Sequence, residues 1–392
     1  MKDRNECREG RLRGLLAVTA CCLGGAVMAD DSASPFDFGV LYTSEIWRNV
    51  SGGREQGSVY LDNLDATLEI DAERLFGWRG TRVLLYGLYN NGRSLSGEKV
   101  GDLQVVSNIE TGVEAARLYE AWIETPVTDR GSLLVGLYDL NREFDVLESA
   151  VRFINSAHGI GTDFGQSGRN GPSIFPVTSL ALRFAWQWND RIRWRAAVLD
   201  GVPGDPDDPG ATTIDLGGGD GALLVGEIEW AQQGRRLLAG AWGYTADFPR
   251  WPDPAAPGPT RRGDGNGGLY LRGETPLGAG GATLFARVGV ADGDYNPFSG
   301  FLGAGVEWAG SIAARPQDSF GIAIALAETS NAYRRAFDAE PREFKLEMTY
   351  RMPIGERITL QPDLQYIRNP GLDPTLDDAW AIGLRFELTL LP

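Results

Sequence analysis

The stretch Ala379–Leu390, AWAIGLRFELTL, alternates almost without fault between apolar residues and small or polar ones. The apolar residues share one parity: Trp380, Ile382, Leu384, Phe386, Leu388 and Leu390. Successive side chains of a β-strand point to opposite faces. The stretch therefore predicts a strand with one fully apolar face and one small or polar face.

The same period-2 pattern recurs along the chain with no helical domain between its copies. A closed membrane barrel needs roughly 10-residue strands whose apolar side faces lipid, whereas a secreted all-β adhesin or lectin would turn that side inward. We predict an all-β fold, an outer-membrane antiparallel β-barrel of about 16 strands. The sixteen candidate strands begin near Phe38, Leu61, Arg82, Val113, Ser132, Ser179, Arg191, Ala222, Arg236, Gly268, Ala282, Phe301, Asp318, Glu343, Ile358 and Ala379.

The clearest pair of predicted strands lies within Ser179–Leu199. Leu182, Phe184 and Trp186 share one parity, and Arg183 lies between them on the other. Asn189 and Asp190 form a two-residue link, which is typical of a tight hairpin. The aromatic residues beside the link are typical of the aromatic girdle at a membrane interface.

The connections between the predicted strands alternate in length. Short turns follow even-numbered strands, and they include Phe76–Thr81, Pro126–Gly131, Asn189–Asp190, Ala231–Arg235, Pro276–Gly281 and Arg351–Arg357. Longer segments rich in Gly, Pro, Asp and Asn follow odd-numbered strands, and they include Asn91–Gly112, Asp139–Thr178, Gly201–Gly221, Asp247–Gly267 and Arg368–Asp378. Bacterial outer-membrane barrels have short periplasmic turns and long external loops. A soluble β-sandwich does not explain why short and long connections alternate along the chain.

Residues 1–29 have the pattern of a signal peptide, with five basic residues before the apolar segment Leu15–Val27. That segment is too short to remain as a membrane helix. We expect cleavage after Val27-Met28-Ala29, which leaves residues 30–392 as the barrel domain. A lipoprotein signal at Cys21 is the alternative, and both imply export.

The composition excludes several classes of function. The 392-residue chain has a formal net charge of −16, so it lacks the basic surface that nucleic-acid binding requires. Its three cysteines all lie in the predicted signal peptide, so no disulfide or thiolate chemistry is expected in the processed chain. No apolar run of about 18 residues follows residue 29, so no membrane helix is predicted.

The polar parity of the strands identifies the residues that should face a water-filled lumen. It contains charges of both signs: Glu120, Glu124, Arg183, Arg193, Arg195, Glu227, Glu229, Arg272, Glu274, Arg287, Glu343, Lys345, Glu347, Asp363, Arg385 and Glu387. Mixed Arg and Glu side chains favour neutral polyhydroxylated solutes through paired hydrogen bonds. Arg183, Arg193 and Arg195 would instead favour anions if no acids neutralised them.

The segment Asp139–Thr178 is unusually long and contains the apolar stretch Val146–Ile154, which argues against disorder. We expect it to fold into the lumen as a constriction. It holds His158, the only histidine. A barrel enzyme would need a nucleophile beside this histidine, but a lone histidine without a cysteine or carboxylate cluster is more often structural.

Several motifs spread over the chain resemble the carbohydrate-selective porins of the OprB family. They are His158–Pro176, Leu61–Asp65 with Phe76–Trp78, Gly101–Glu110 and Leu360–Gly371. The resemblance implies a sixteen-stranded outer-membrane barrel of a Gram-negative bacterium that passes monosaccharides. It also implies that the loops after the third and fifth strands narrow the channel, and that lumen Arg and Glu residues line its narrowest point.

We therefore expect passive diffusion of monosaccharides such as glucose, with no catalytic residues, cofactor or metal. The barrel would contact outer-membrane lipid, and the sequence leaves open whether it forms homo-oligomers. General or anion-selective porins, a barrel enzyme and a plugged structural barrel remain as alternatives. Strand parity and loop position give the candidate sugar-contacting residues Arg183, Arg193, Arg195, Glu120, Asp102, Asp163, Arg169 and Asn170.

Overall fold

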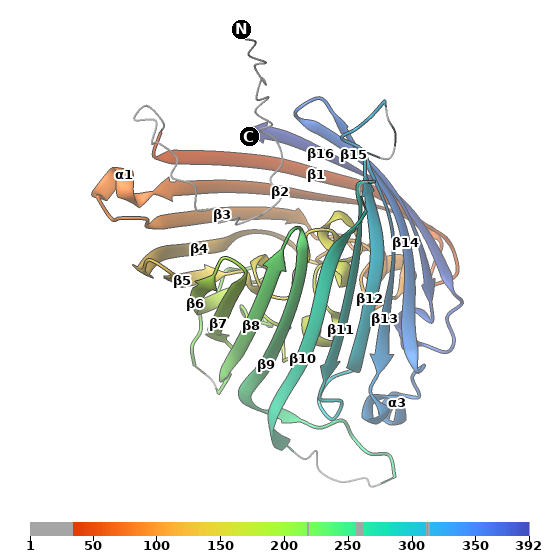
Figure 1. The fold of residues 1–392 in the computed structure, drawn as a ribbon. Coiled ribbons are helices and arrows are strands. Elements are labelled where there is room, and N and C mark those ends of the chain that lie inside the picture. Colours follow the sequence, from red (N-terminus) through yellow and green to blue (C-terminus); the bar gives the residue numbers. More distant parts are fainter. Residues whose placement is uncertain are drawn as a thin grey trace.

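A computed structural model describes residues 34–217, 219–255, 262–278, 280–310, 312 and 314–391. The predicted signal peptide, residues 1–29, lies outside the described residues. Within them the chain forms a closed barrel of sixteen strands in which every strand is antiparallel to its sequence neighbours and β16 pairs with β1 (Figure 1). The fold class is the predicted one.

The sixteen strands begin close to the predicted positions. They are β1 Phe36–Ser51, β2 Gly57–Asp71, β3 Arg82–Asn91, β4 Glu114–Thr128, β5 Gly131–Tyr138, β6 Ser179–Asn189, β7 Ile192–Asp200, β8 Ala222–Gln232, β9 Arg235–Pro249, β10 Arg262–Leu277, β11 Ala282–Ala291, β12 Phe298–Ala309, β13 Ser319–Thr329, β14 Arg342–Ile354, β15 Ile358–Arg368 and β16 Ala379–Leu391. Only β10 begins much earlier than expected. Its glycine-rich start has little strand propensity, but β9 supplies a partner ladder.

The helical elements are all short. They are α1 Ala72–Phe76, α2 Thr162–Gly165 and α3 Asn331–Phe337, with single helical turns at Ser96–Val100, Leu140–Arg142, Ala150–Arg152, Ser156–His158 and Pro370–Leu372. Among the described residues no helix has the length and apolar character needed to cross a membrane.

The alternation of connection lengths holds in general but is not strict. The β1–β2 connection, residues 52–56, belongs to the long side and is nevertheless a tight turn. Gly52 and Gly53 both adopt positive φ there, which glycine tolerates best. The β2–β3 connection belongs to the short side, yet it contains α1, whose first turn is capped by the Asp71 carboxylate.

The parity of the strands also follows the prediction at β16. Trp380, Ile382 and Leu384 are exposed on the outer wall, whereas Ala379 and Ala381 are fully buried against the interior. The wall differs at β9, where Leu238, Trp242 and Tyr244 face inward and are buried. The expectation that inward positions are small or polar is therefore wrong for this part of the wall.

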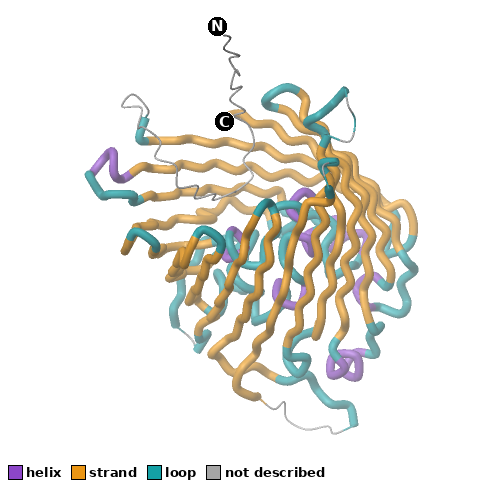
Figure 2. Tube along the Cα trace, in the orientation of Figure 1, coloured by secondary structure: helices purple, strands orange, loops and turns teal. Residues whose placement is uncertain are grey.

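These inward aromatic residues are explained by what fills the barrel. The 139–178 loop, yellow in Figure 1, lies inside the ring of strands, and Figure 2 shows the same enclosed coil and helical turns. Phe164 of this loop stacks on Trp242, with ring centroids 4.8 Å apart and an interplanar angle of 7°. An apolar loop needs an apolar wall, because burial of apolar surface is what stabilises it there.

Close packing of the inner wall gives a test of this arrangement. A Cβ on Gly240 of β9 would lie 2.1 Å from the Tyr270 ring, whereas a Cβ on Gly226 of β8 would meet nothing within 4 Å. We expect Gly240→Val to destabilise the barrel by roughly 1–3 kcal/mol through overpacking. The measurement is the temperature at which the folded band is lost in gel electrophoresis. Gly226→Val is the matched control. An equal decrease of this temperature in both variants would contradict the packing described.

Candidate functional site

The inner wall holds the 139–178 loop and the 92–113 loop through glutamate side chains. Five inward-facing glutamates from four strands accept backbone N–H groups of these loops: Glu120 from Asp139 at 3.2 Å, Glu227 from Asp145 at 3.1 Å, Glu274 from Ser149 at 3.0 Å, Glu343 from Gln104 at 2.8 Å and Glu347 from Ile154 at 2.6 Å. All five are buried. A buried N–H without a partner is costly, and a charged acceptor strengthens the bond. These carboxylates are therefore anchors of the loops.

Arginine side chains of the wall donate hydrogen bonds to carbonyl oxygens of the 139–178 loop. Arg287 donates to the carbonyl oxygens of Asp145 at 2.9 Å, His158 at 3.0 Å and Ala157 at 3.2 Å. Arg195 donates to the carbonyl oxygen of Glu143. The planar guanidinium suits this role because it presents five N–H donors in a fixed geometry.

The two loops also contact each other across the lumen. The N–H of Asn108 donates to the carbonyl oxygen of Ile154 at 2.9 Å, and the N–H of Ser156 donates to that of Val105 at 3.2 Å. Gln166 adds a side-chain bond to the carbonyl oxygen of Leu103. The loops thus form one connected layer inside the barrel.

Three of the eight predicted site residues converge on one part of this layer. Arg183 forms an ion pair with Glu143 at 2.7 Å, and Arg195 donates to the backbone of the same residue. Glu120 accepts from the Arg142 Nε at 3.0 Å. Arg142 and Glu143 were not among the sequence candidates, although they follow β5 directly.

The other five predicted residues lie apart from that point. Arg193 donates to Gln187 beside the β6–β7 turn. Asp102 pairs with Lys345 at 2.5 Å, and Asp163 lies against Gly289 of β11. Two lie in the C-terminal part of the 139–178 loop. There Arg169 pairs with Asp220 at 3.1 Å and Asn170 donates to the carbonyl oxygen of Pro203 at 2.7 Å.

Of the predicted residues, Arg169 and Asn170 are exposed and Arg193 is half-buried, but other accessible side chains in the barrel were not predicted. On the loop they are Arg142, Glu148 and Arg152, of which Arg152 lies 3.7 Å from Glu307 of β12. On the wall, half-buried Tyr86 donates to Asp65 at 2.7 Å. The alternation of β2 and β3 places both inward, but an uncharged Tyr86 gives no signal in a search for charged lumen positions.

Two titratable groups of the 139–178 loop have strongly shifted pKa values. Burial lowers the pKa of His158 to about 3, and the charges of Arg287 and Lys345 add to this effect. Because His158 is neutral, its 3.5 Å approach to Glu347 is not an ion pair. Burial raises the pKa of Asp163 to about 7, with a further contribution from the neighbouring carboxylate of Asp145.

His158 packs between aromatic rings, with its ring centroid 5.1 Å from Phe153 and 5.9 Å from Phe285. Its two ring nitrogens form no hydrogen bond with any described residue. A general base needs a proton to accept within hydrogen-bond reach. His158 is therefore a packing residue. No group of three or more metal-ligating side chains occurs in the part of the chain that is described.

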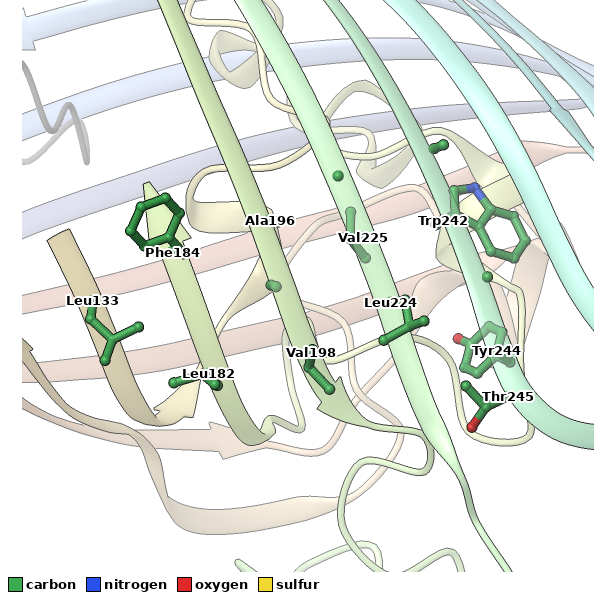
Figure 3. Close-up of a pocket in the computed structure, with 14 residues that line it drawn as sticks. Leu133, Leu182, Phe184, Ala196, Val198, Leu224, Val225, Trp242, Tyr244 and Thr245 are labelled. Carbon is green, nitrogen blue, oxygen red and sulfur yellow. The ribbon is translucent and has the colours of Figure 1, made fainter. Parts of the chain in front are cut away.

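A hollow of 650 Å³ lies on the outer wall of β5–β9 (Figure 3). Its rim includes Leu182, Val198 and Leu224, all of which are exposed on the outward face. Small residues between them, such as Gly226 and Ala241, leave the space open. This apolar hollow belongs to the lipid-facing surface of a membrane barrel.

A closed sixteen-stranded barrel with an apolar outer band and loops held inside it defines the protein as a porin of the Gram-negative outer membrane. Residues 55–390 match the carbohydrate-selective porin, OprB family, and the chain belongs to that family. Like other porins it is a channel protein and not an enzyme.

Individual relatives agree with this assignment. Porin B of Pseudomonas aeruginosa is 22% identical over 437 residues, which cover 95% of this chain and 96% of that protein. The high-pH structure of Pseudomonas putida OprB is 20% identical, covers 91% of this chain and 94% of its own, and superposes with a TM-score of 0.81. The anion-selective porin from Comamonas acidovorans shares the fold at 10% identity, 90% and 98% coverage and a TM-score of 0.55.

Loss of one wall anchor should loosen the loop layer. Glu347 accepts from Ile154 and from Asn155, so Glu347→Ala leaves two buried N–H groups without a partner, at about 1–3 kcal/mol each. We expect a larger and noisier single-channel current in a planar bilayer. Glu347→Gln keeps one of the two acceptor oxygens and should change the current less than Glu347→Ala does. A quiet, unaltered current in Glu347→Ala would exclude the anchoring role.

Proposed function

We propose that this porin lets neutral monosaccharides such as glucose diffuse passively across the outer membrane, through a lumen narrowed by the 92–113 and 139–178 loops. The family to which the chain belongs, described as carbohydrate-selective, supports a sugar as the solute. The anchored loop layer supports narrowing by the loops. We further propose that residues 1–29 are removed on export.

The pairing of lumen charges is the observation that carries the proposal. Arg183 lies 2.9 Å from Glu124, Arg236 lies 2.7 Å from Glu229, and Arg351 lies 2.7 Å from Glu387, each measured between guanidinium nitrogen and carboxylate oxygen. Adjacent opposite charges largely cancel at a distance, so they create no strong field that would enrich one sign of ion.

Paired charges suit a polyhydroxylated solute for a second reason. Each sugar hydroxyl group can donate one hydrogen bond and accept others, so it needs donors and acceptors side by side. Arg152 near Glu307 and Glu148 near Arg236 offer both at the accessible edge of the loop. We infer that solute contacts fall on these accessible groups, with Glu120, Arg183 and Arg195 acting by holding Arg142 and Glu143 in place.

The pairing argues against the anion-selective alternative. Of the three arginines on which the anion-selective alternative rests, Arg183 and Arg195 are each paired with two carboxylates. Arg193 faces Glu229 in the β7–β8 register. Neutralised arginines give anions no lasting advantage over cations.

Glucose should reduce the ion current of single channels in a planar bilayer in a saturable way, because a sugar held in the narrowed lumen excludes ions. The measurement is current against glucose concentration, with a larger oligosaccharide as the size control. A current that glucose leaves unchanged would overturn sugar binding in the lumen. No current from folded protein would overturn open passage.

Removal of one lumen carboxylate should convert the channel toward anion selectivity. Glu229 contacts both Arg195 and Arg236, so Glu229→Gln leaves two guanidinium groups short of a partner. We expect the anion-to-cation permeability ratio, taken from the reversal potential in a salt gradient, to rise roughly twofold or more. Glu328→Gln, at an exposed position of β13, is the control. An unchanged ratio in Glu229→Gln would remove the charge-pairing argument.

A further inference from the structure

At the end of β4 near the long loops, the barrel wall is built partly from loops. β4 begins at Glu114, but its pairing with β5 starts only at Ala121. The free edge is covered by two other segments. Thr212 of the 201–221 loop exchanges hydrogen bonds with the backbone of Leu118, at 3.0 and 3.2 Å. Thr178 donates to the carbonyl oxygen of Tyr119.

A cavity of 260 Å³ lies beneath this cover. Its lining comes from the start of β4, from the C-terminal part of the 139–178 loop and from the 201–221 loop, and it includes Thr111, Arg117, Asn170, Phe175 and Pro209. The volume lies just below the lower end of the range for small-ligand pockets, about 300 Å³, so it limits the solute to roughly the size of a single hexose.

Arg117 lines this cavity and lacks a carboxylate partner. Its side chain is buried, with the residue 6% exposed. One guanidinium nitrogen, Nη2, donates to the carbonyl oxygen of Pro209. Nε and Nη1 are shielded from solvent and form no hydrogen bond with any described residue.

This isolation is unusual within the barrel. The other buried arginines of the lumen, among them Arg183, Arg195 and Arg272, are each within ion-pair distance of Asp or Glu. A buried charge without a counter-charge is strongly unfavourable, and a neutral hydroxyl group supplies hydrogen-bond acceptors but no compensating charge. A negatively charged group in the cavity would supply both the counter-charge and the hydrogen-bond acceptors that Arg117 lacks.

We propose that this cavity is a binding site for a hexose-sized solute that carries a carboxylate, such as a sugar acid, with the carboxylate accepting hydrogen bonds from the free nitrogens of Arg117. Thr111 and Asn170 are the polar groups that face the remainder of the solute. The site is distinct from the paired charges along the lumen. The inference does not rest on the proposed passage of neutral sugars.

The test is equilibrium binding of gluconate and of glucose to the refolded full barrel, measured by calorimetry. We expect gluconate to bind at least about tenfold more tightly than glucose. Arg117→Gln should abolish gluconate binding. Arg250→Gln makes the same chemical change at an exposed arginine paired with Asp294, and it should bind gluconate as before. Equal affinity for glucose and gluconate, no gluconate binding, or full binding by Arg117→Gln would each overturn the site.

A second variant keeps the test decisive if Arg117→Gln does not fold. Asn170→Asp places a carboxylate in the same cavity, where it would compete with the solute for Arg117, and gluconate affinity should fall by at least about tenfold. Asn170→Ala is the neutral control and should lose less. Equal loss in the two variants would contradict charge competition. Glucose block of the ion current should persist in Arg117→Gln, which separates failure of this site from failure of the proposed passage.

Discussion

The interior of this porin depends on one kind of interaction, the hydrogen bond from a loop N–H to a glutamate of the barrel wall. A loop that enters a barrel loses water from its backbone, and each buried N–H then needs a partner. Apart from the free edge of β4, strands supply few partners, because their backbone groups are already used in the ladders that close the barrel. Side chains from the inward face must do so. Glu120, Glu227, Glu274 and Glu347 meet the 139–178 loop in succession, and Glu343 meets the 92–113 loop.

The same requirement explains why charge and apolar character coexist on the inner wall. The carboxylates hold the loop backbone, while Trp242 and Tyr270 stack on the loop's Phe164 ring. Wall arginines such as Arg272 then compensate the buried carboxylates, as the 2.5 Å contact with Glu227 illustrates. Many charges inside the barrel therefore occur as pairs of opposite sign, which weakens the field that each creates at a distance. Arg117 differs from the other buried arginines because it has no carboxylate partner, and this difference singles out the cavity that it lines.

The comparison of sequence and structure separates two kinds of residue. Strand positions, the parity of β16 and the inward placement of Glu227, Arg272 and Glu347 follow directly from period-2 alternation. The roles of those side chains do not. Arg183 was predicted to contact solute, but it is buried in ion pairs with Glu124 and Glu143. Arg142 was missed, because nothing local to a loop indicates which of its residues will lie across the barrel from a given strand.

By itself the sequence determined the barrel, the inward and outward faces of most of its strands, and the long loop that enters the interior. These are local properties, since alternation and turn residues act over a few positions. Only the tertiary structure decided which inward charges bind loops and which remain accessible. Contacts such as Ile154 with Glu347 join residues nearly two hundred positions apart, and their formation depends on barrel closure and on the path of the loop. Arg117 shows the difference most clearly. Strict alternation from Glu120 would turn it outward. Only the irregular β3–β4 register between Tyr86 and Gly87 brings it inside, where it has no counter-charge.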